Sequence, residues 1–194
     1  TGMNDIHSIK KTTGILEKYR IQYALLHCTN VYPTPARLVR LGALTQLKRE
    51  FPLAVIGLSD HTVNNNACLA AAALGANILE RHFTDTKERT GPDIICSMDV
   101  KELKELKLGV EEIFEMRGGV KGVVEEEKPT VNFAFATVVA IKDISEGEEL
   151  TCQNVWVKRP GTGEIKAEDF ENILGKRSSK DIKQDCHLQW KDVI

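Results

Sequence analysis

The sequence predicts an α/β fold: the C-terminal portion of a (β/α)8 TIM barrel followed by a small β-rich domain. Three apolar runs alternate with helical patterns at a nearly regular spacing, which is typical of a parallel sheet with crossover helices. A complete barrel takes about 250 residues and eight strands. Here the pattern ends after three strands, and the composition changes after Gly118-Gly119.

The first part of the chain reads as repeated strand-helix units. Its strand-like runs, predicted as buried parallel strands, span 23–29, 53–58 and 77–83. Helical patterns precede, separate and follow these runs, at 6–19, 36–51, 64–74 and 101–116.

Capping signals support these boundaries. Asn4 or Asp5 can cap the first helix, Pro35 can open the second, and Gly75 can close the third. The positions at which the strands begin and end are therefore well marked.

The second part of the chain is predicted to differ. Residues 120–132 are a predicted linker, because they carry an acidic run and no apolar periodicity. Strand-like runs at 133–141 and 155–157, with a helix at 167–174, follow. The predicted organisation is therefore a partial barrel at 1–119, a linker, and a β-rich domain at 133–194.

Composition excludes several classes of protein. The chain has 26 basic and 28 acidic residues, a net charge of −2, so it lacks the uniformly positive surface that binding to nucleic acid or anionic membranes needs. Its five cysteines include no CxxC pair and indicate reduced thiols. No apolar run approaches about 18 residues, and no basic leader is present. We expect a cytoplasmic protein without a targeting or membrane segment.

Polar residues end all three predicted strands, where parallel α/β sheets bind their ligands. His61 and His82 are one strand-helix-strand unit apart, at the same height on strands about 4.8 Å apart. The two imidazoles could share one metal ion, with Asp60 or Asp93 adding oxygen ligands. The spacing is equally consistent with histidines that only hydrogen-bond to their loops.

Other polar residues near the strand ends are open to two interpretations. Asn30 and Ser59 are neutral donors that could hold an anion, but turn chemistry also explains them. Asp93, on the turn Thr90-Gly91-Pro92-Asp93, is either a turn former or an acceptor for sugar hydroxyls.

Outside the strand ends, one basic residue stands out. Arg159 precedes a Pro-Gly turn and could bind a carboxylate or a planar acyl group through two hydrogen bonds. The alternative is a solvated surface arginine. His7 and His187 follow no strand end, and we predict ordinary surface residues.

Five motifs, in this order, together resemble bacterial N-acetylneuraminate (sialic acid) synthases: His27-Cys-Thr-Asn-Val-Tyr-Pro-Thr-Pro35, Gly57-Leu-Ser-Asp-His-Thr62, Leu79-Glu-Arg-His-Phe-Thr84, Gly91-Pro-Asp93 and Val157-Lys-Arg-Pro-Gly161. The resemblance covers nearly the whole chain. It implies a (β/α)8 barrel followed by a SAF domain, which is similar to type III antifreeze protein.

The resemblance also implies roles for individual residues. His61 and His82 resemble the ligands of a divalent metal ion, Mn²⁺ or Mg²⁺. Asn30 and Ser59 resemble contacts to phosphoenolpyruvate.

Sugar recognition is implied for a second group. Tyr32 and Asp93 resemble contacts to the sugar. In the family's homodimer the SAF domain of one subunit covers the barrel mouth of the other, so Arg159 resembles the residue that reaches the sugar's N-acyl group. Phe133 and Thr130 resemble parts of this covering domain, which acts as a lid over the site.

The implied reaction joins phosphoenolpyruvate to N-acetylmannosamine and releases phosphate. C3 of phosphoenolpyruvate attacks the sugar aldehyde, whose oxygen the metal polarises, and water then adds at C2. His61, His82 and Asp93 are the predicted catalytic residues. Orientation and exclusion of water in a closed site would contribute to the rate.

Two alternatives remain open. A synthase of legionaminic or pseudaminic acid would use a different N-acylated sugar. The second alternative is a non-catalytic carbohydrate-binding remnant. It is favoured by the absence of the family's earlier barrel strands, with their phosphate-binding lysines. We therefore expect a fragment that is inactive alone.

Overall fold

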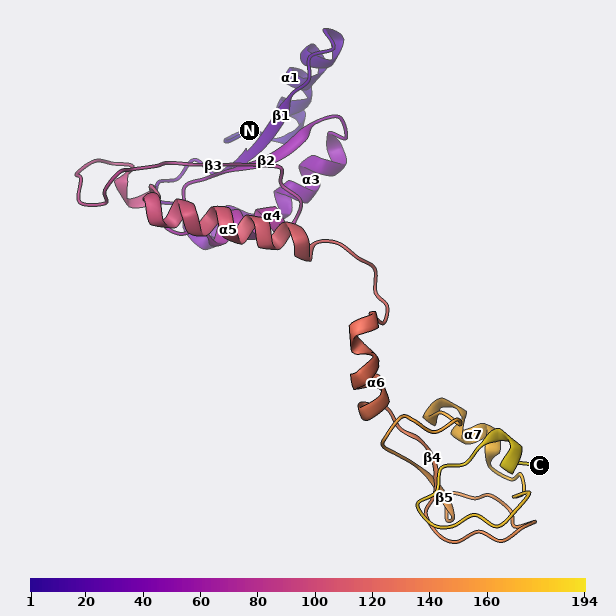
Figure 1. The fold of residues 1–194 in the computed structure, drawn as a ribbon. Helices are drawn as coiled ribbons and strands as arrows, with labels where there is room; N and C mark the ends of the chain where they lie inside the picture. The colour runs from indigo at the N-terminus through magenta and orange to yellow at the C-terminus, as the bar shows by residue number, and fades with distance from the viewer. The chain divides into compact units, whose positions relative to one another are not determined.

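The chain divides after Gly119 into two units with separate hydrophobic cores in the computed structural model, which describes residues 1–194 (Figure 1). Unit 1 is Thr1–Gly119 and unit 2 is Val120–Ile194. The division lies next to the position at which the composition of the sequence changes.

Unit 1 is built on a parallel sheet in the order β1-β2-β3. Its strands are β1 (Ala24–Cys28), β2 (Val55–Asp60) and β3 (Ile78–Arg81). The three predicted strands are confirmed, with one correction: Ser59 and Asp60 belong to β2 rather than to the loop after it. Ser59 pairs with both Cys28 and Glu80, so the carboxyl ends of all three strands meet at one edge.

The helices of unit 1 are α1 (Ile6–Lys18), α2 (Ala36–Val39), α3 (Gly42–Glu50), α4 (Asn66–Ala73), the 3₁₀ turn η1 (Ile94–Cys96) and α5 (Val100–Met116). Asp5 caps α1 by accepting the Ser8 N–H at 2.8 Å. The helix predicted over 36–51 is interrupted, because Arg40 adopts a left-handed conformation with φ 50°. A non-glycine residue in that region ends a helix.

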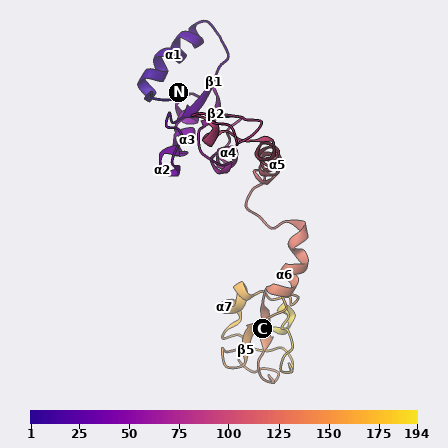
Figure 2. The ribbon, with the colours of Figure 1, turned by 90° about the vertical axis from the view of Figure 1, so that its left-hand side faces the viewer.

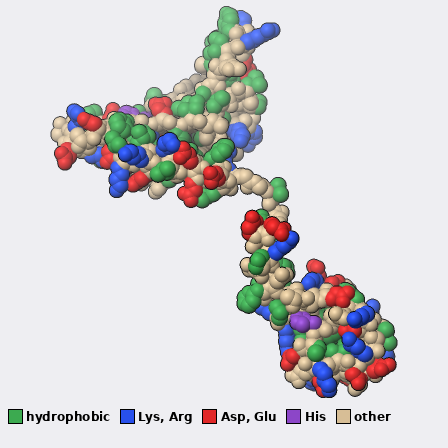
Figure 3. All heavy atoms as spheres, viewed as in Figure 1, with side chains coloured by type: hydrophobic (Ala, Val, Ile, Leu, Met, Phe, Trp, Pro, Cys, Tyr) green, Lys and Arg blue, Asp and Glu red, His purple; other side chains and the backbone are tan.

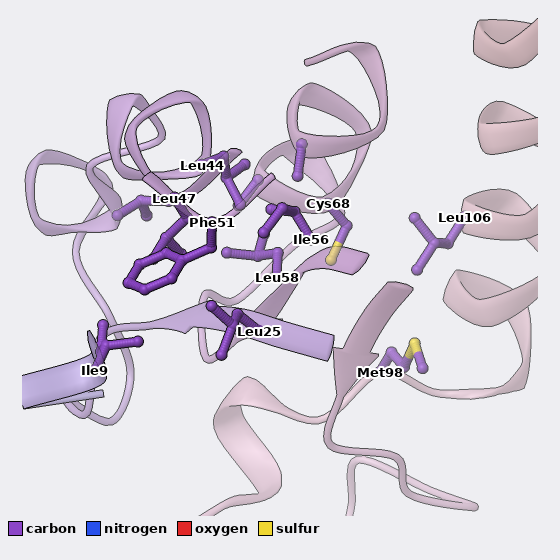
Figure 4. Packing of buried hydrophobic residues seen from close by; sticks show 13 residues of the cluster. Ile9, Leu25, Leu44, Leu47, Phe51, Ile56, Leu58, Cys68, Met98 and Leu106 are labelled. Atoms are coloured by element: carbon purple, nitrogen blue, oxygen red, sulfur yellow. The ribbon is translucent and has the colours of Figure 1, made fainter. Parts of the chain in front are cut away.

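One face of the sheet is covered and the other is open. Helices α3, α4 and α5 lie on the same side of the strands (Figures 1 and 2). Leu25, Ile56 and Leu58 pack there in the hydrophobic cluster of Figure 4. On the opposite face, Val55 and Ile78 remain 45% and 38% exposed. Parallel sheets are usually covered on both faces, so the open face is compatible with the predicted barrel, which itself remains a prediction.

A buried ion pair joins the ends of β2 and β3. Arg81 Nε lies 3.3 Å from Asp60 Oδ2, and the two side chains are 1% and 2% exposed. The guanidinium donates to Asn65 Oδ1 at 2.6 Å, to Thr62 O at 2.8 Å and to Cys96 O at 3.3 Å, whereas Nε itself has no hydrogen-bond partner. Asp60 in turn accepts the Thr62 N–H at 3.0 Å. Arg81 therefore ties the end of β3 to the loop between β2 and α4.

Unit 2 is a small β-rich fold. Its elements are η2 (Glu125–Glu127), α6 (Lys128–Ala134), β4 (Thr137–Ala140), β5 (Val155–Lys158), η3 (Ala167–Asp169), α7 (Phe170–Ile173) and η4 (Trp190–Asp192). Strands β4 and β5 pair antiparallel, and Val138, Leu150 and Ile165 are fully buried beside them.

Two predictions for this region were wrong in detail. The strand expected from residue 133 begins only at Thr137, and the preceding residues form α6. The segment predicted as a linker therefore contains helix, which Pro129 favours because proline is well tolerated in the first turn. Every residue from 120 to 130 is nevertheless exposed.

The surface carries mixed charges on both units (Figure 3). All five cysteines are free. None of the helices combines the length and the apolar character that crossing a bilayer requires.

Replacing Arg81 with methionine should lower the free energy of unfolding by about 3–5 kcal/mol, because the Asp60 carboxylate would stay buried without its partner. Urea denaturation measures the change. Arg89→Met is the matched control, because Arg89 pairs with Asp85 at the surface. The urea concentration at the midpoint of unfolding of this variant should equal that of the unsubstituted protein. An Arg81→Met protein as stable as this control would contradict the structural role given to the pair.

Candidate functional site

Three aromatic side chains converge at the carboxyl ends of the parallel strands. The His61 and His82 rings, which follow β2 and β3, have centroids 5.2 Å apart. The Tyr32 ring, from the loop after β1, lies 4.0 Å from His61 and 5.9 Å from His82. Residues from three separate loops thus form one cluster, which we call the strand-end cluster.

The His61 ring is fixed by the loop after β1. Its Nδ1 lies 3.1 Å from the carbonyl oxygen of Thr29. Because a carbonyl can only accept, Nδ1 carries a proton, and in the neutral ring the lone pair is on Nε2. The backbone is held as well, since Thr34 N–H donates to His61 O at 2.9 Å. A metal-binding histidine is commonly oriented in this way.

His82 has a carboxylate beside it. Asp93 Oδ2 lies 3.5 Å from His82 Nδ1, and the two side chains are 33% and 51% exposed. An acidic group at this position favours a proton on Nδ1 and leaves Nε2 as the ligand atom. The two histidines therefore present the same kind of donor, which fits a divalent first-row metal ion.

Cys96 also lies near His82 and Asp93, and potential ligand atoms of the three residues are within 4.8 Å of one another. The Cys96 thiol donates to Asp93 O at 3.3 Å. Burial raises the pKa of this thiol, and a soft sulfur ligand suits Cu⁺ or Zn²⁺ better than the Mn²⁺ or Mg²⁺ that the resemblance implies. We therefore favour the two imidazoles and not Cys96 as metal ligands.

Asn30 and Ser59 both lie near Cys28. Cys28 pairs with Ser59 across the sheet, and its Sγ lies 3.6 Å from Asn30 Oδ1. Asn30 also sits directly over Gly2, where a Cβ would come within 1.7 Å of Oδ1. Both side chains are thus near the sheet edge that carries the strand-end cluster.

Two residues that the sequence suggested play other parts. Asp60, considered as an oxygen ligand, is buried against Arg81 and unavailable to a metal ion. His187, predicted as an ordinary surface residue, is half-buried and lies 2.8 Å from Thr137 Oγ1 through Nδ1. His7 is exposed, as predicted.

Larger hollows occur elsewhere in unit 1. One of about 450 Å³ lies among α1, β1 and α3, and one of about 510 Å³ lies between α2 and α4. Neither is lined by His61 or His82. Within the strand-end cluster, Tyr32 is 46% exposed and the His82 side chain 33% exposed, whereas His61 is buried at 5%.

The remaining predicted site residues belong to unit 2. Thr130 and Phe133 are exposed on α6. Arg159 is exposed beyond the end of β5, and its side chain makes neither a hydrogen bond nor an ion pair. The turn after Arg159 contacts α6, because Gly161 N–H donates to Asn132 O at 2.7 Å.

Sequence reasoning missed the groups that hold these residues in place. Thr29 orients His61 through its backbone carbonyl. Every residue has such a carbonyl, so the residue type at this position does not predict the contact. In the sequence, Arg81 is only one of several polar residues near a strand end. Its pairing with Asp60 follows from the register of β2 and β3, which alternation along a single strand does not give.

Family comparisons agree with the resemblance. The NeuB family profile matches residues 1–122, and the SAF domain profile matches residues 135–194.

Individual relatives are synthases of related acidic sugars. The chain is 40% identical to an N,N'-diacetyllegionaminic acid synthase of Campylobacter jejuni over 95% of its own length and 56% of that protein. It is 36% identical to a pseudaminic acid synthase of the same species, over 81% of the chain and 46% of the relative. The chain thus spans about half the length of these relatives.

A solved structure supports the same relationship. The N-acetylneuraminic acid (sialic acid) synthetase of Leptospira borgpetersenii, crystallised with citrate, matches with a TM-score of 0.62 and 30% identity, over 67% of this chain and 46% of that one. With both profiles in chain order, the protein belongs to the NeuB family and carries a SAF domain.

Proposed function

We propose that the whole protein condenses phosphoenolpyruvate with an N-acylated mannosamine-type sugar to give a nonulosonic acid and phosphate. The observation that carries this proposal is the convergence of Tyr32, His61 and His82 at the carboxyl ends of β1, β2 and β3. Ligands of parallel α/β folds bind at that edge. The NeuB relatives named as synthases support the choice of reaction.

In this proposal His61 and His82 hold a divalent cation, Mn²⁺ or Mg²⁺, through their Nε2 atoms. The hydrogen bond from His61 Nδ1 to Thr29 O supports it, since in the neutral ring it leaves Nε2 as the atom that can bind a metal ion. When bound, such an ion supplies Lewis-acid polarisation of the sugar aldehyde oxygen.

The neighbouring side chains would bind and orient the two substrates. Asp93 lies beside His82 with half of its side chain exposed, so it can accept hydrogen bonds from sugar hydroxyls. The exposed phenol of Tyr32 can contact the same sugar. Asn30 and Ser59 are neutral donors suited to the anionic groups of phosphoenolpyruvate.

The SAF domain would supply the lid. Arg159 has no partner within the chain, and its guanidinium can donate two hydrogen bonds to a planar acyl group. We propose a homodimer in which Arg159, with Thr130 and Phe133 on α6, serves the site of the other subunit. The five free cysteines fit the reducing cytoplasm, where we place the protein.

Two acceptor sugars are in competition. The sequence motifs favour N-acetylmannosamine. A diacetamido-trideoxy sugar is the second candidate, because the Campylobacter relative with 40% identity is named for N,N'-diacetyllegionaminic acid. In this proposal the strand-end cluster does not separate them, since it would contact groups that both sugars share.

Phosphate release by the full-length protein should require both phosphoenolpyruvate and one of these sugars. We expect turnover of one sugar to exceed that of the other by about 10-fold or more, because a buried polar group left unpaired by the wrong substrate is costly. Failure to release phosphate with either sugar, despite sugar binding, would contradict the proposed reaction and favour the non-catalytic carbohydrate-binding alternative.

Mixing two inactive full-length variants tests the lid proposal. Arg159→Ala and His61→Ala subunits should each be inactive, whereas mixed dimers keep one intact site when the lid acts between subunits. Random reassortment of a two-fold dimer then restores about a quarter of the unsubstituted activity. Lys158→Ala is the control for Arg159→Ala, because Lys158 already pairs with Asp185. No recovery in the mixture would contradict a lid supplied by the partner.

A further inference from the structure

Side chains bind three backbone carbonyls of the turn 160–163, which directly follows Arg159. Thr137 Oγ1 donates to Pro160 O at 3.1 Å. Lys166 Nζ donates to Gly161 O at 3.0 Å and to Gly163 O at 2.9 Å. Gly161 and Gly163 are buried, so their carbonyls need partners within the protein, and the Lys166 side chain provides them.

His187 completes the arrangement. The Thr137 hydroxyl has one proton, which goes to Pro160 O, so the hydroxyl must accept from His187 Nδ1 at 2.8 Å. Thr137 is fully buried, and residue 139 of the same strand forms a bridge with His187. Two separate parts of unit 2 therefore hold the turn through one hydroxyl.

Close contact explains the glycines of the turn. A Cβ at Gly163 would lie 2.5 Å from Thr137 Oγ1 and 2.7 Å from His187 Nδ1. A Cβ at Gly161 would lie 2.9 Å from Val131 O of α6. The backbone of the turn thus packs directly on the groups that fix it.

The Arg159 side chain, unlike the backbone of the turn that follows it, is not held by other groups. It is exposed and has no partner in the chain. A flexible arginine on a flexible turn would lose more freedom on binding than one whose backbone is already ordered. A turn fixed in advance therefore favours ligand binding by Arg159.

We propose that Thr137, His187 and Lys166 are positioning residues that hold the Arg159 turn in its sugar-binding geometry and thereby set the affinity for the acceptor sugar. The inference rests on the proposed function, in which Arg159 contacts the N-acyl group. None of the three positioning residues needs to touch the sugar. Their effect should be specific to the acceptor and absent for phosphoenolpyruvate.

The test uses the full-length protein with Lys166→Met and Thr137→Val. Lys166 is exposed, so its replacement does not threaten folding, and Thr137→Ser retains the hydroxyl as the conservative variant. Lys176→Met is the matched control, since Lys176 is an exposed lysine of the same unit without an ion pair. Hydrogen exchange of peptide 158–163 and the KM of each substrate are measured for all variants.

We expect Lys166→Met and Thr137→Val to speed amide exchange of the peptide and to raise the KM for the sugar about 5-fold, as for loss of one hydrogen bond. The KM for phosphoenolpyruvate should not change, and Thr137→Ser and Lys176→Met should behave as the unsubstituted protein.

Unchanged exchange in both variants, or faster exchange with an unchanged sugar KM, would overturn the inference. An equal rise in both KM values would do so as well, because it indicates a general structural role. Failure of the proposed function is distinguishable, since it would appear in the unsubstituted protein as an absence of condensation, or in Arg159→Ala as an unchanged dissociation constant for the sugar, measured by calorimetry.

Discussion

The candidate site depends on the buried contact between Asp60 and Arg81. Each of these residues directly precedes one of the two histidines, so the pair sets the relative height of His61 and His82. Two charges that are 1% and 2% exposed tolerate little separation, because an uncompensated buried charge costs several kcal/mol. Arg81 also binds Thr62 O and Asn65, and thereby fixes the loop that continues from His61.

Alternation along the strands divides structural from functional residues. Asp60 and Arg81 point toward the helices, together with Ile56 and Leu58, whereas Ser59 and Glu80 point to the open face. The core therefore orders the backbone without occupying the surface on which ligands would bind. Unit 2 follows the same principle at a smaller scale, because buried Thr137 fixes a turn whose Arg159 side chain stays free.

The sequence was sufficient for the strands, most of the helices and the positions of both histidines, because hydrophobic runs and polar strand ends are local signals. It was insufficient where distant groups decide the outcome. The left-handed Arg40 splits a helix whose apolar pattern is continuous, and α6 begins at Lys128, inside the segment predicted as a linker. The carbonyl of Thr29 and the hydroxyl of Thr137 act through tertiary contacts that no spacing in the sequence encodes.

The affinity of the full-length protein for Mn²⁺, measured by calorimetry, tests the central claim most directly. If the two imidazoles are the ligands, His61→Ala and His82→Ala should each weaken binding by more than about 100-fold, beyond the effect of losing a group that only orients a ligand. His7→Ala and Cys96→Ala should bind as the unsubstituted protein does. Unchanged affinity in the first two variants, or a loss confined to Cys96→Ala, would contradict the account.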